Sequence, residues 1–126
     1  MRLLLDTHIF LWWTKDDRRL SKIARSKILQ ASEVYISSAS IWEAAIKIQL
    51  KKLDCDIDQL IGAIAESGFL ELPITAHHAA AVLQLPEIHR DPFDRILIAQ
   101  AISEPLAFLT ADPALKNYSG LVEVVS

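Results

Sequence analysis

The sequence lacks the features that would place the chain outside the cell or in a membrane. It has one cysteine, Cys55, which excludes a disulfide framework. No apolar run approaches the length that spans a bilayer, and the N-terminus shows no cleavable targeting pattern. We therefore expect an intracellular, cytoplasmic protein with no membrane partner.

Internal repeats, low-complexity tracts and long linkers are also missing. The length of 126 residues suits one domain, and we expect that domain to cover residues 1–126. Because 52% of the residues are hydrophobic, the chain can form a full core and is not expected to be disordered.

The chain has no excess of positive charge. Its formal net charge is −3, whereas a basic nucleic-acid clamp normally shows a clear positive excess. A polyanionic substrate must therefore be met by a local basic patch, by metal ions or by a dimer surface.

What the chain does have is a short apolar run at its start that stops on a carboxylate, Asp6. The three leucines before it predict a strand that is buried on both faces. In α/β proteins, the end of such a strand lies at the sheet edge where chemistry takes place.

Strand-like and helix-like segments alternate along the rest of the chain. Further strands are expected at 34–37, 69–74, 107–110 and 121–125. Helices are expected at 7–14, after an N-cap at Ser21, at about 38–53, from the aspartates at 54–58 to Gly68, at 75–85 and at 91–102, with a short helical turn after Asp112. This order predicts an α/β fold: a central parallel sheet of about five strands with helices on both faces.

Such a sheet would bring four distant acids to one edge. Asp6 and Asp112 follow strands, and Glu43 lies near the start of the helix after the second strand. Asp94 opens a helix that must run antiparallel to the strand it leads into, so its N-terminus lies at the same edge. We therefore expect the four carboxylates to face one crevice.

Each of these acids also has a purely structural interpretation. Asp91 and Asp112 each precede a proline and suit helix N-caps. Asp94 would then be an early-turn acid that the helix dipole favours. Ser40 and Glu43 have the spacing of a capping box.

Taken together, however, the acids indicate a cation site. Several carboxylates at one edge raise one another's pKa, and a bound cation removes that cost. A cluster of oxygen ligands without cysteine or a histidine pair suits Mg²⁺ or Mn²⁺. Such ions can activate water for in-line attack on a phosphodiester, which would leave a 5′-phosphate and a 3′-hydroxyl.

Four segments carry a family resemblance: Leu4–His8, Ser38–Glu43, His89–Arg95 with Ile98–Ala101, and Leu109–Asp112. In this order they resemble the PIN domain, and most closely the VapC-type toxins of bacterial and archaeal toxin–antitoxin pairs. The resemblance runs from the first strand to the last and so covers essentially the whole chain.

The resemblance implies a Mg²⁺- or Mn²⁺-dependent endoribonuclease that cuts structured RNA such as tRNA or ribosomal RNA. The family's acidic quartet corresponds to Asp6, Glu43, Asp94 and Asp112. Asp6 and Asp94 would be the main metal ligands, with Asp112 close by, and Glu43 would act directly or through a water molecule.

Supporting residues and partners are implied in the same way. Thr7 and Thr110 match positions that hydrogen-bond to the carboxylates or to water, and Asp91 is a cap that could support them. Apart from the resemblance, Arg95 follows Asp94 directly, and we favour it as a phosphate contact. Family members form homodimers that a VapB-like antitoxin inhibits, and operator DNA is reached only indirectly, through that antitoxin.

Other polar and aromatic residues carry weaker signals. Lys47, Lys51 and Lys52 are candidates for phosphate contact, but we favour their interpretation as an ordinary charged face. His8 and His89 lie near the proposed site. His77 and His78 are adjacent on a helix and point in different directions, and the three tryptophans suit the core or a dimer surface: Trp12, Trp13 and Trp42.

Two other function classes compete with the nuclease. A receiver-like, non-catalytic module would bind Mg²⁺ for regulation, but it needs a lysine just after a late strand, where this chain has Thr110, Ala111 and Asp112. A phosphatase with an aspartate nucleophile expects a second aspartate two residues after Asp6, where this chain has His8.

Overall fold

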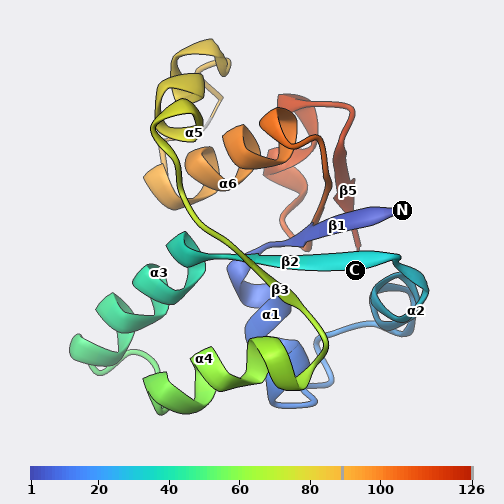
Figure 1. Cartoon of the computed structure of the whole chain (residues 1–126), viewed down its shortest axis with the longest axis vertical. Helices are drawn as coiled ribbons and strands as arrows, with labels where there is room; N and C mark the ends of the chain where they lie inside the picture. Colours follow the sequence, from blue (N-terminus) through green and yellow to red (C-terminus); the bar gives the residue numbers. More distant parts are fainter. Residues whose placement is uncertain (89, 126) are drawn as a thin grey trace.

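The computed structural model describes residues 1–88 and 90–125 and forms layers of helices on either side of a sheet (Figure 1). The elements are β1 Arg2–Leu5, α1 Thr7–Thr14, α2 Lys22–Gln30, β2 Glu33–Ser37, α3 Ser38–Gln49, α4 Ile57–Glu66, β3 Leu70–Leu72, α5 Ala76–Ala81, the 3₁₀ helix η1 Val82–Gln84, α6 Pro92–Ser103, β4 Ala107–Thr110, the 3₁₀ helix η2 Pro113–Tyr118 and β5 Val122–Val124.

The five strands form one sheet in the order β3-β2-β1-β4-β5, and every neighbouring pair is parallel. The predicted α/β class with a parallel sheet of five strands is therefore confirmed. The first strand of the chain lies in the middle of the sheet. In chain order, β2 and then β3 lie on one side of β1, and β4 and then β5 lie on its other side.

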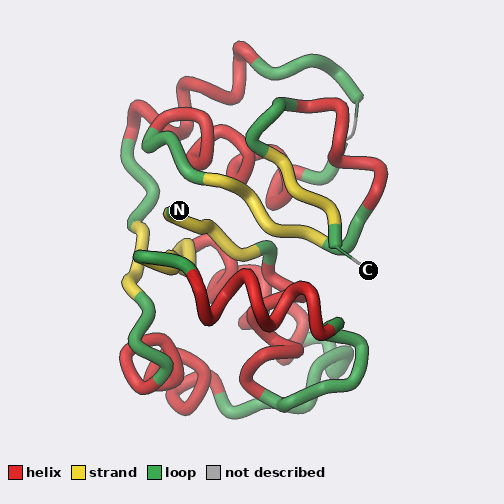
Figure 2. The backbone as a smooth tube through the Cα atoms, turned by 90° about the vertical axis from the view of Figure 1, so that its right-hand side faces the viewer, coloured by secondary structure: helices red, strands yellow, loops and turns green. Residues whose placement is uncertain are grey.

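The central strand is buried on both faces, as its three leucines predict. Leu3 and Leu5 pack with side chains of α1, α2 and α4. Leu4 points to the opposite face and packs with side chains of α6 and η2. All three leucines are completely buried, and each contributes roughly 2 kcal/mol by leaving water. Figure 2 shows the strands running between these helices.

Several segments are shorter than the sequence predicts; the helix expected at about 38–53, for example, ends at Gln49. In two of them a proline lies just past the end of the segment. The strand expected at 69–74 ends at Leu72, because Pro73 has no N–H to continue the ladder. The helix expected at 75–85 ends at Ala81 and continues as the 3₁₀ turn η1. Leu85 is extended, with φ −79° and ψ 143°, because Pro86 disfavours the helical conformation in the residue before it.

The sequence interpretation of Gly68 and of the histidine pair agrees with the structure. Gly68 follows the end of α4 at φ +76°, which glycine adopts without strain. His78 is buried, whereas His77 is exposed. His78 Nδ1 accepts the backbone N–H of Thr75 at 3.0 Å, so Nε2 holds the ring proton and faces Glu104 Oε2 at 2.6 Å. This pair fastens α5 to the end of α6.

The strand order places a crevice at one edge of the sheet. The strands that follow β1 in the chain lie first on one side of it (β2, β3) and then on the other (β4, β5), so the strand order reverses between β1 and β4. Ligands of open α/β sheets bind at such a reversal, outside the carboxyl ends of the strands.

The helices of residues 1–88 and 90–125 include none with the length and hydrophobicity of a membrane span.

Candidate active site

A groove of about 440 Å³ lies at this edge of the sheet. Its lining joins the end of β1, the start of α1, one face of α3, the start of α6 and the end of β4. The residues that line it are Asp6, His8, Glu43, Ile46, Lys47, Leu50, Lys52, Asp91, Phe93, Asp94 and Asp112. The structure therefore brings together the four predicted acids, and adds Asp91 as a fifth.

The carboxylate of Asp6 is held in one orientation by hydrogen bonds to both of its oxygens. Asp6 follows β1 and is only 6% exposed. Its Oδ1 accepts the backbone N–H of Thr7 at 2.7 Å, which caps α1, and its Oδ2 accepts the hydroxyl of Thr110 at 2.7 Å. Burial raises the pKa of Asp6, and the nearby Glu43 raises it further, although these two hydrogen bonds and His8 act against the rise.

Asp94 is the groove acid on which all the other acids of the groove act. It lies in the first turn of α6, whose N-cap is Asp91. Burial is the largest cause that raises the pKa of Asp94, to about 7, and the negative charges of the four other groove acids add to the rise: Asp6, Asp91, Glu43 and Asp112. Because all four acids affect Asp94, the five carboxylates form one electrostatic unit.

Thr110 connects two of the acids. Its hydroxyl donates to Asp6 and accepts the backbone N–H of Asp112 at 3.1 Å. Asp112 in turn accepts the N–H of Ala114 at 2.9 Å and so caps η2. One buried hydroxyl therefore sets the relative positions of the residues that follow β1 and β4.

Glu43 reaches the groove from α3, and its predicted role as part of a capping box is wrong. The helix begins at Ser38, and Ser37 is the N-cap, with its hydroxyl accepting the N–H of Ala39 at 3.0 Å. Glu43 is therefore in the second turn, beyond the reach of its own helix start. Its carboxylate instead pairs with Lys47, whose Nζ lies 3.2 Å from Glu43 Oε2.

The capping interpretation of Asp91 and Asp112 agrees with their hydrogen bonds, and both also line the groove. Asp91 Oδ1 accepts the N–H groups of Phe93 and Asp94 at 2.8 and 3.3 Å. A cap and a site acid are thus compatible roles, because a helix N-terminus favours negative charge at the same place.

Two supporting residues differ in their relation to the groove. Thr7 is buried beneath it, and its hydroxyl donates to Ser40 at 2.9 Å, which fastens α1 to α3. Arg95 follows Asp94 but extends elsewhere: its guanidinium donates to the carbonyls of Pro86 and Val82 at 2.9 and 3.2 Å. His89 lies outside the described residues.

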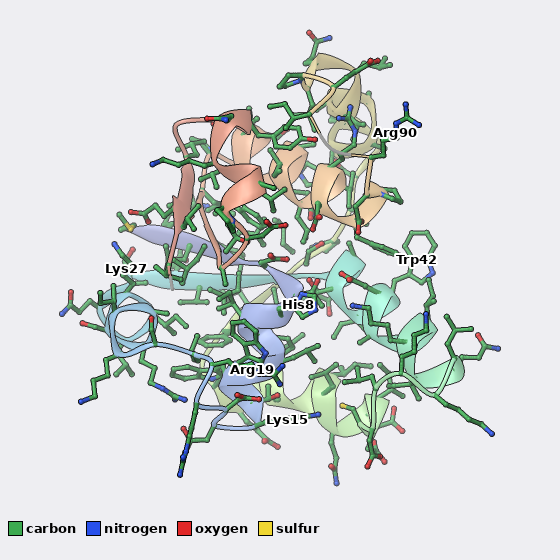
Figure 3. All side chains as sticks on the ribbon, turned by 180° about the vertical axis from the view of Figure 1, so that it is seen from behind. His8, Lys15, Arg19, Lys27, Trp42 and Arg90 are labelled. Carbon is green, nitrogen blue, oxygen red and sulfur yellow. The ribbon has the colours of Figure 1, made fainter. Side chains whose placement is uncertain are left out.

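Several lining residues were not predicted from the sequence. Ile46, Lys47 and Leu50 reach the groove because they share a face of α3 with Glu43. Their spacing of three, four and seven residues from Glu43 is a signal that could have indicated this. His8 lies in α1 beside Asp6, and Trp42 extends outward from α3 (Figure 3), where its ring meets Phe93 at 5.0 Å between centroids.

The donor set fits a divalent cation that prefers oxygen. Five carboxylates, one of them with a pKa raised to about 7 by burial and by the others, gain from a positive charge in the groove. Within residues 1–88 and 90–125, no three acidic, histidine or cysteine side chains are already grouped as they would be around an ion. Binding would therefore require the side chains to rotate toward the ion.

A comparison with protein-family models decides the family. The model described as the PIN domain matches residues 3–121. This chain belongs to the PIN domain family. The expectation from the four sequence segments is thereby confirmed, and the match spans β1 through the turn before β5.

Relatives of this PIN domain carry more specific descriptions. It is 30% identical over 119 residues to "Ribonuclease VapC22" of Mycobacterium tuberculosis (strain ATCC 25618 / H37Rv), covering 92% of this chain and 91% of the relative. Two solved structures share its fold. The VapBC2 structure from Rickettsia felis, bound to a promoter DNA fragment, has a TM-score of 0.70 at 13% identity, over 99% and 98% of the two chains. The DNA-bound VapBC from Salmonella typhimurium has a TM-score of 0.66 at 18% identity, over 95% and 94%.

The raised pKa of Asp94 predicts how stability depends on pH without divalent ions. An unfolded aspartate titrates near pH 3.9, so between about pH 4 and 7 the unfolded state loses a proton that folded Asp94 retains. Stability therefore falls as pH rises through this window. In EDTA, we expect Asp94→Asn to raise the melting temperature at pH 8 by roughly 4 °C and to change it little at pH 4.

Asp58→Asn is the matched control, because Asp58 is also an acid in a first helical turn, that of α4, and lies outside the groove. Scanning calorimetry would measure both variants. Equal effects of the two substitutions at pH 8 would contradict the electrostatic account of the groove.

Proposed function

We propose that this PIN domain is a metal-dependent endoribonuclease toxin that hydrolyses phosphodiester bonds in structured RNA, such as tRNA or ribosomal RNA, in the cytoplasm. The observation that carries the proposal is the convergence of Asp6, Glu43, Asp94 and Asp112 on one groove, where the pKa of Asp94 is raised to about 7. The ribonuclease name of the mycobacterial relative supports the choice of RNA.

The chemistry follows from the side chains that converge. Asp6 and Asp94 would hold Mg²⁺ or Mn²⁺, with Asp112 and Glu43 completing the set directly or through water. The ion would supply an activated water and positive charge at the phosphate. Asp6 is fixed by Thr7 and Thr110 and so keeps its orientation. Glu43, which pairs with Lys47, would accept a proton from water.

The alternative of a receiver-like regulatory module is less well supported. A receiver needs a lysine just after a late strand, and β4 is followed by Ala111 and Asp112. Asp6 could still bind Mg²⁺ in such a module, so a wild-type protein that does not cleave RNA with metal present is the outcome that would favour it.

Cleavage of total cellular RNA tests the proposal. With Mn²⁺ or Mg²⁺ and partner-free protein, we expect discrete cuts that leave 5′-phosphates and that disappear in EDTA. Asp94→Asn should lower the rate by about 100-fold or more, because it removes a metal ligand. Asp58→Asn should cut like the wild type.

Mapping the RNA ends would identify the cut positions and the chemistry. Cleavage that survives both EDTA and Asp94→Asn would contradict the proposed mechanism. A folded wild-type protein without any metal-dependent cleavage would leave the regulatory module as the better proposal.

We also propose that a VapB-like antitoxin inhibits the enzyme by inserting a segment into the acid groove. The structural neighbours from Rickettsia felis and Salmonella typhimurium support an antitoxin partner, because both are VapBC structures. Contact with operator DNA would then belong to the antitoxin. Adding the partner to the cleavage reaction measures the inhibition, and undiminished cutting in the bound complex would contradict it.

A homodimer is the third part of the proposal. An apolar hollow of about 490 Å³ lies beside the acid groove and shares Phe93 with it; its lining also includes Trp42, Ile74 and Val82. Trp42 is 61% exposed, and Leu83, which follows the lining residue Val82 in η1, is 86% exposed. Such a patch is typical of a protein interface.

Light scattering after size exclusion tests the dimer. We expect the wild type to be dimeric at micromolar concentration and Leu83→Asp, in η1, to shift it toward the monomer, because a buried carboxylate opposes association. Leu29→Asp in α2 is the control, since Leu29 is 75% exposed and lies at the other end of the sheet. A monomeric wild type would contradict the proposed assembly.

A further inference from the structure

The charge of the groove presents a problem for a nuclease. Five carboxylates line it, and an RNA strand carries a negative charge at every phosphate. The net charge of −3 gives no general attraction. Among the described residues that line the groove, the lysine and arginine side chains are Lys47 and Lys52.

The two lysines lie at one end of the groove. Glu43, Ile46, Lys47 and Leu50 share one face of α3, because they are three or four residues apart. Lys52 follows in the turn after this helix. The groove lining therefore changes from acidic at Glu43 to basic at Lys47 and Lys52, with four residues, a rise of about 6 Å, between Glu43 and Lys47.

Lys47 is held at the boundary between these two ends. Its ammonium lies 3.2 Å from Glu43 Oε2, and the side chains are 32% and 12% exposed. Glu43 is close enough to Asp6 and Asp94 to raise the pKa of both. A lysine ammonium has three donors, so Lys47 can keep its contact with Glu43 and donate to a phosphate oxygen as well.

We propose that Lys47 and Lys52 bind RNA phosphates next to the phosphate that is cleaved. The proposal rests on the proposed nuclease function and assigns the basic end of the groove to the strand on one side of the cut. It also replaces the sequence interpretation, which favoured Arg95. The guanidinium of Arg95 is engaged by the carbonyls of Pro86 and Val82, whereas both lysines line the groove of the acids.

Salt dependence of RNA binding tests this assignment. The probe is a fluorescein-labelled, single-stranded RNA of 12 nucleotides, bound by Asp94→Asn protein so that it stays intact, at constant Mg²⁺ and varied KCl. Adding Lys47→Met or Lys52→Met should weaken binding about five- to tenfold at low salt. Each should make the slope of log K against log salt less negative by about 0.7.

Two further variants separate charge from position. Lys47→Arg should restore most of the affinity, because the positive charge is kept. Lys22→Met in α2 removes the same charge at the opposite edge of the sheet and should leave the slope unchanged. Melting curves would establish that all variants are folded.

The result that overturns the assignment is a Lys47→Met variant that binds RNA with the affinity and slope of Lys22→Met. If the same substitution in the otherwise wild-type enzyme lowers kcat at constant KM, Lys47 acts only by holding Glu43. If the wild type cleaves RNA but the lysine variants keep the wild-type slope of log K against log salt, the lysine assignment is refuted and the nuclease proposal stands. An absence of both RNA cleavage and RNA binding would refute the nuclease proposal and this assignment together.

Discussion

The parallel direction of all five strands is the constraint on which the site depends. It places the carboxyl ends of β1 and β4 side by side at one edge, together with the starts of α1, α6 and η2. Each of those starts is capped by an aspartate: Asp6, Asp91 and Asp112. The backbone N–H groups that these helices leave unpaired attract carboxylates, so the same geometry that builds the sheet gathers the acids.

This gathering has an electrostatic cost that the fold only partly offsets. Asp6 is stabilised by the N–H of Thr7 and the hydroxyl of Thr110, but burial still raises its pKa. The pKa of Asp94 is raised as well, by burial first and then by the four other carboxylates. Lys47 compensates Glu43. What remains is a groove that gains stability from a cation and that repels RNA except at the end of α3.

The sequence was sufficient for the fold and for the convergence of the acids. Strand and helix patterns alternate clearly, and the carboxyl-edge rule places Asp6, Glu43, Asp94 and Asp112 without knowledge of any contact. Prolines displaced the ends of two segments, because Pro73 ends a ladder and Pro86 ends a helix. Those boundaries depend on local backbone conformation that hydrophobic periodicity does not report.

Side-chain direction is what the sequence could not supply. Arg95 seemed well placed because it follows Asp94, yet adjacent residues on a helix point about 100° apart, and its guanidinium reaches the loop at Pro86. Lys47 seemed an ordinary surface lysine, yet it shares a helix face with Glu43. The predicted capping box of Ser40 and Glu43 is wrong because α3 begins earlier, after the N-cap Ser37.

The central claim is that these acids form one divalent-cation site, and a crystal structure with bound Mn²⁺ tests it most directly. The account predicts anomalous Mn²⁺ density between the carboxylates of Asp6 and Asp94, with oxygen ligands at about 2.1–2.2 Å and with Asp112 or Glu43 bound directly or through water. Mn²⁺ bound elsewhere, or a groove that stays empty of metal at millimolar Mn²⁺ with Asp6 and Asp94 intact, would contradict it.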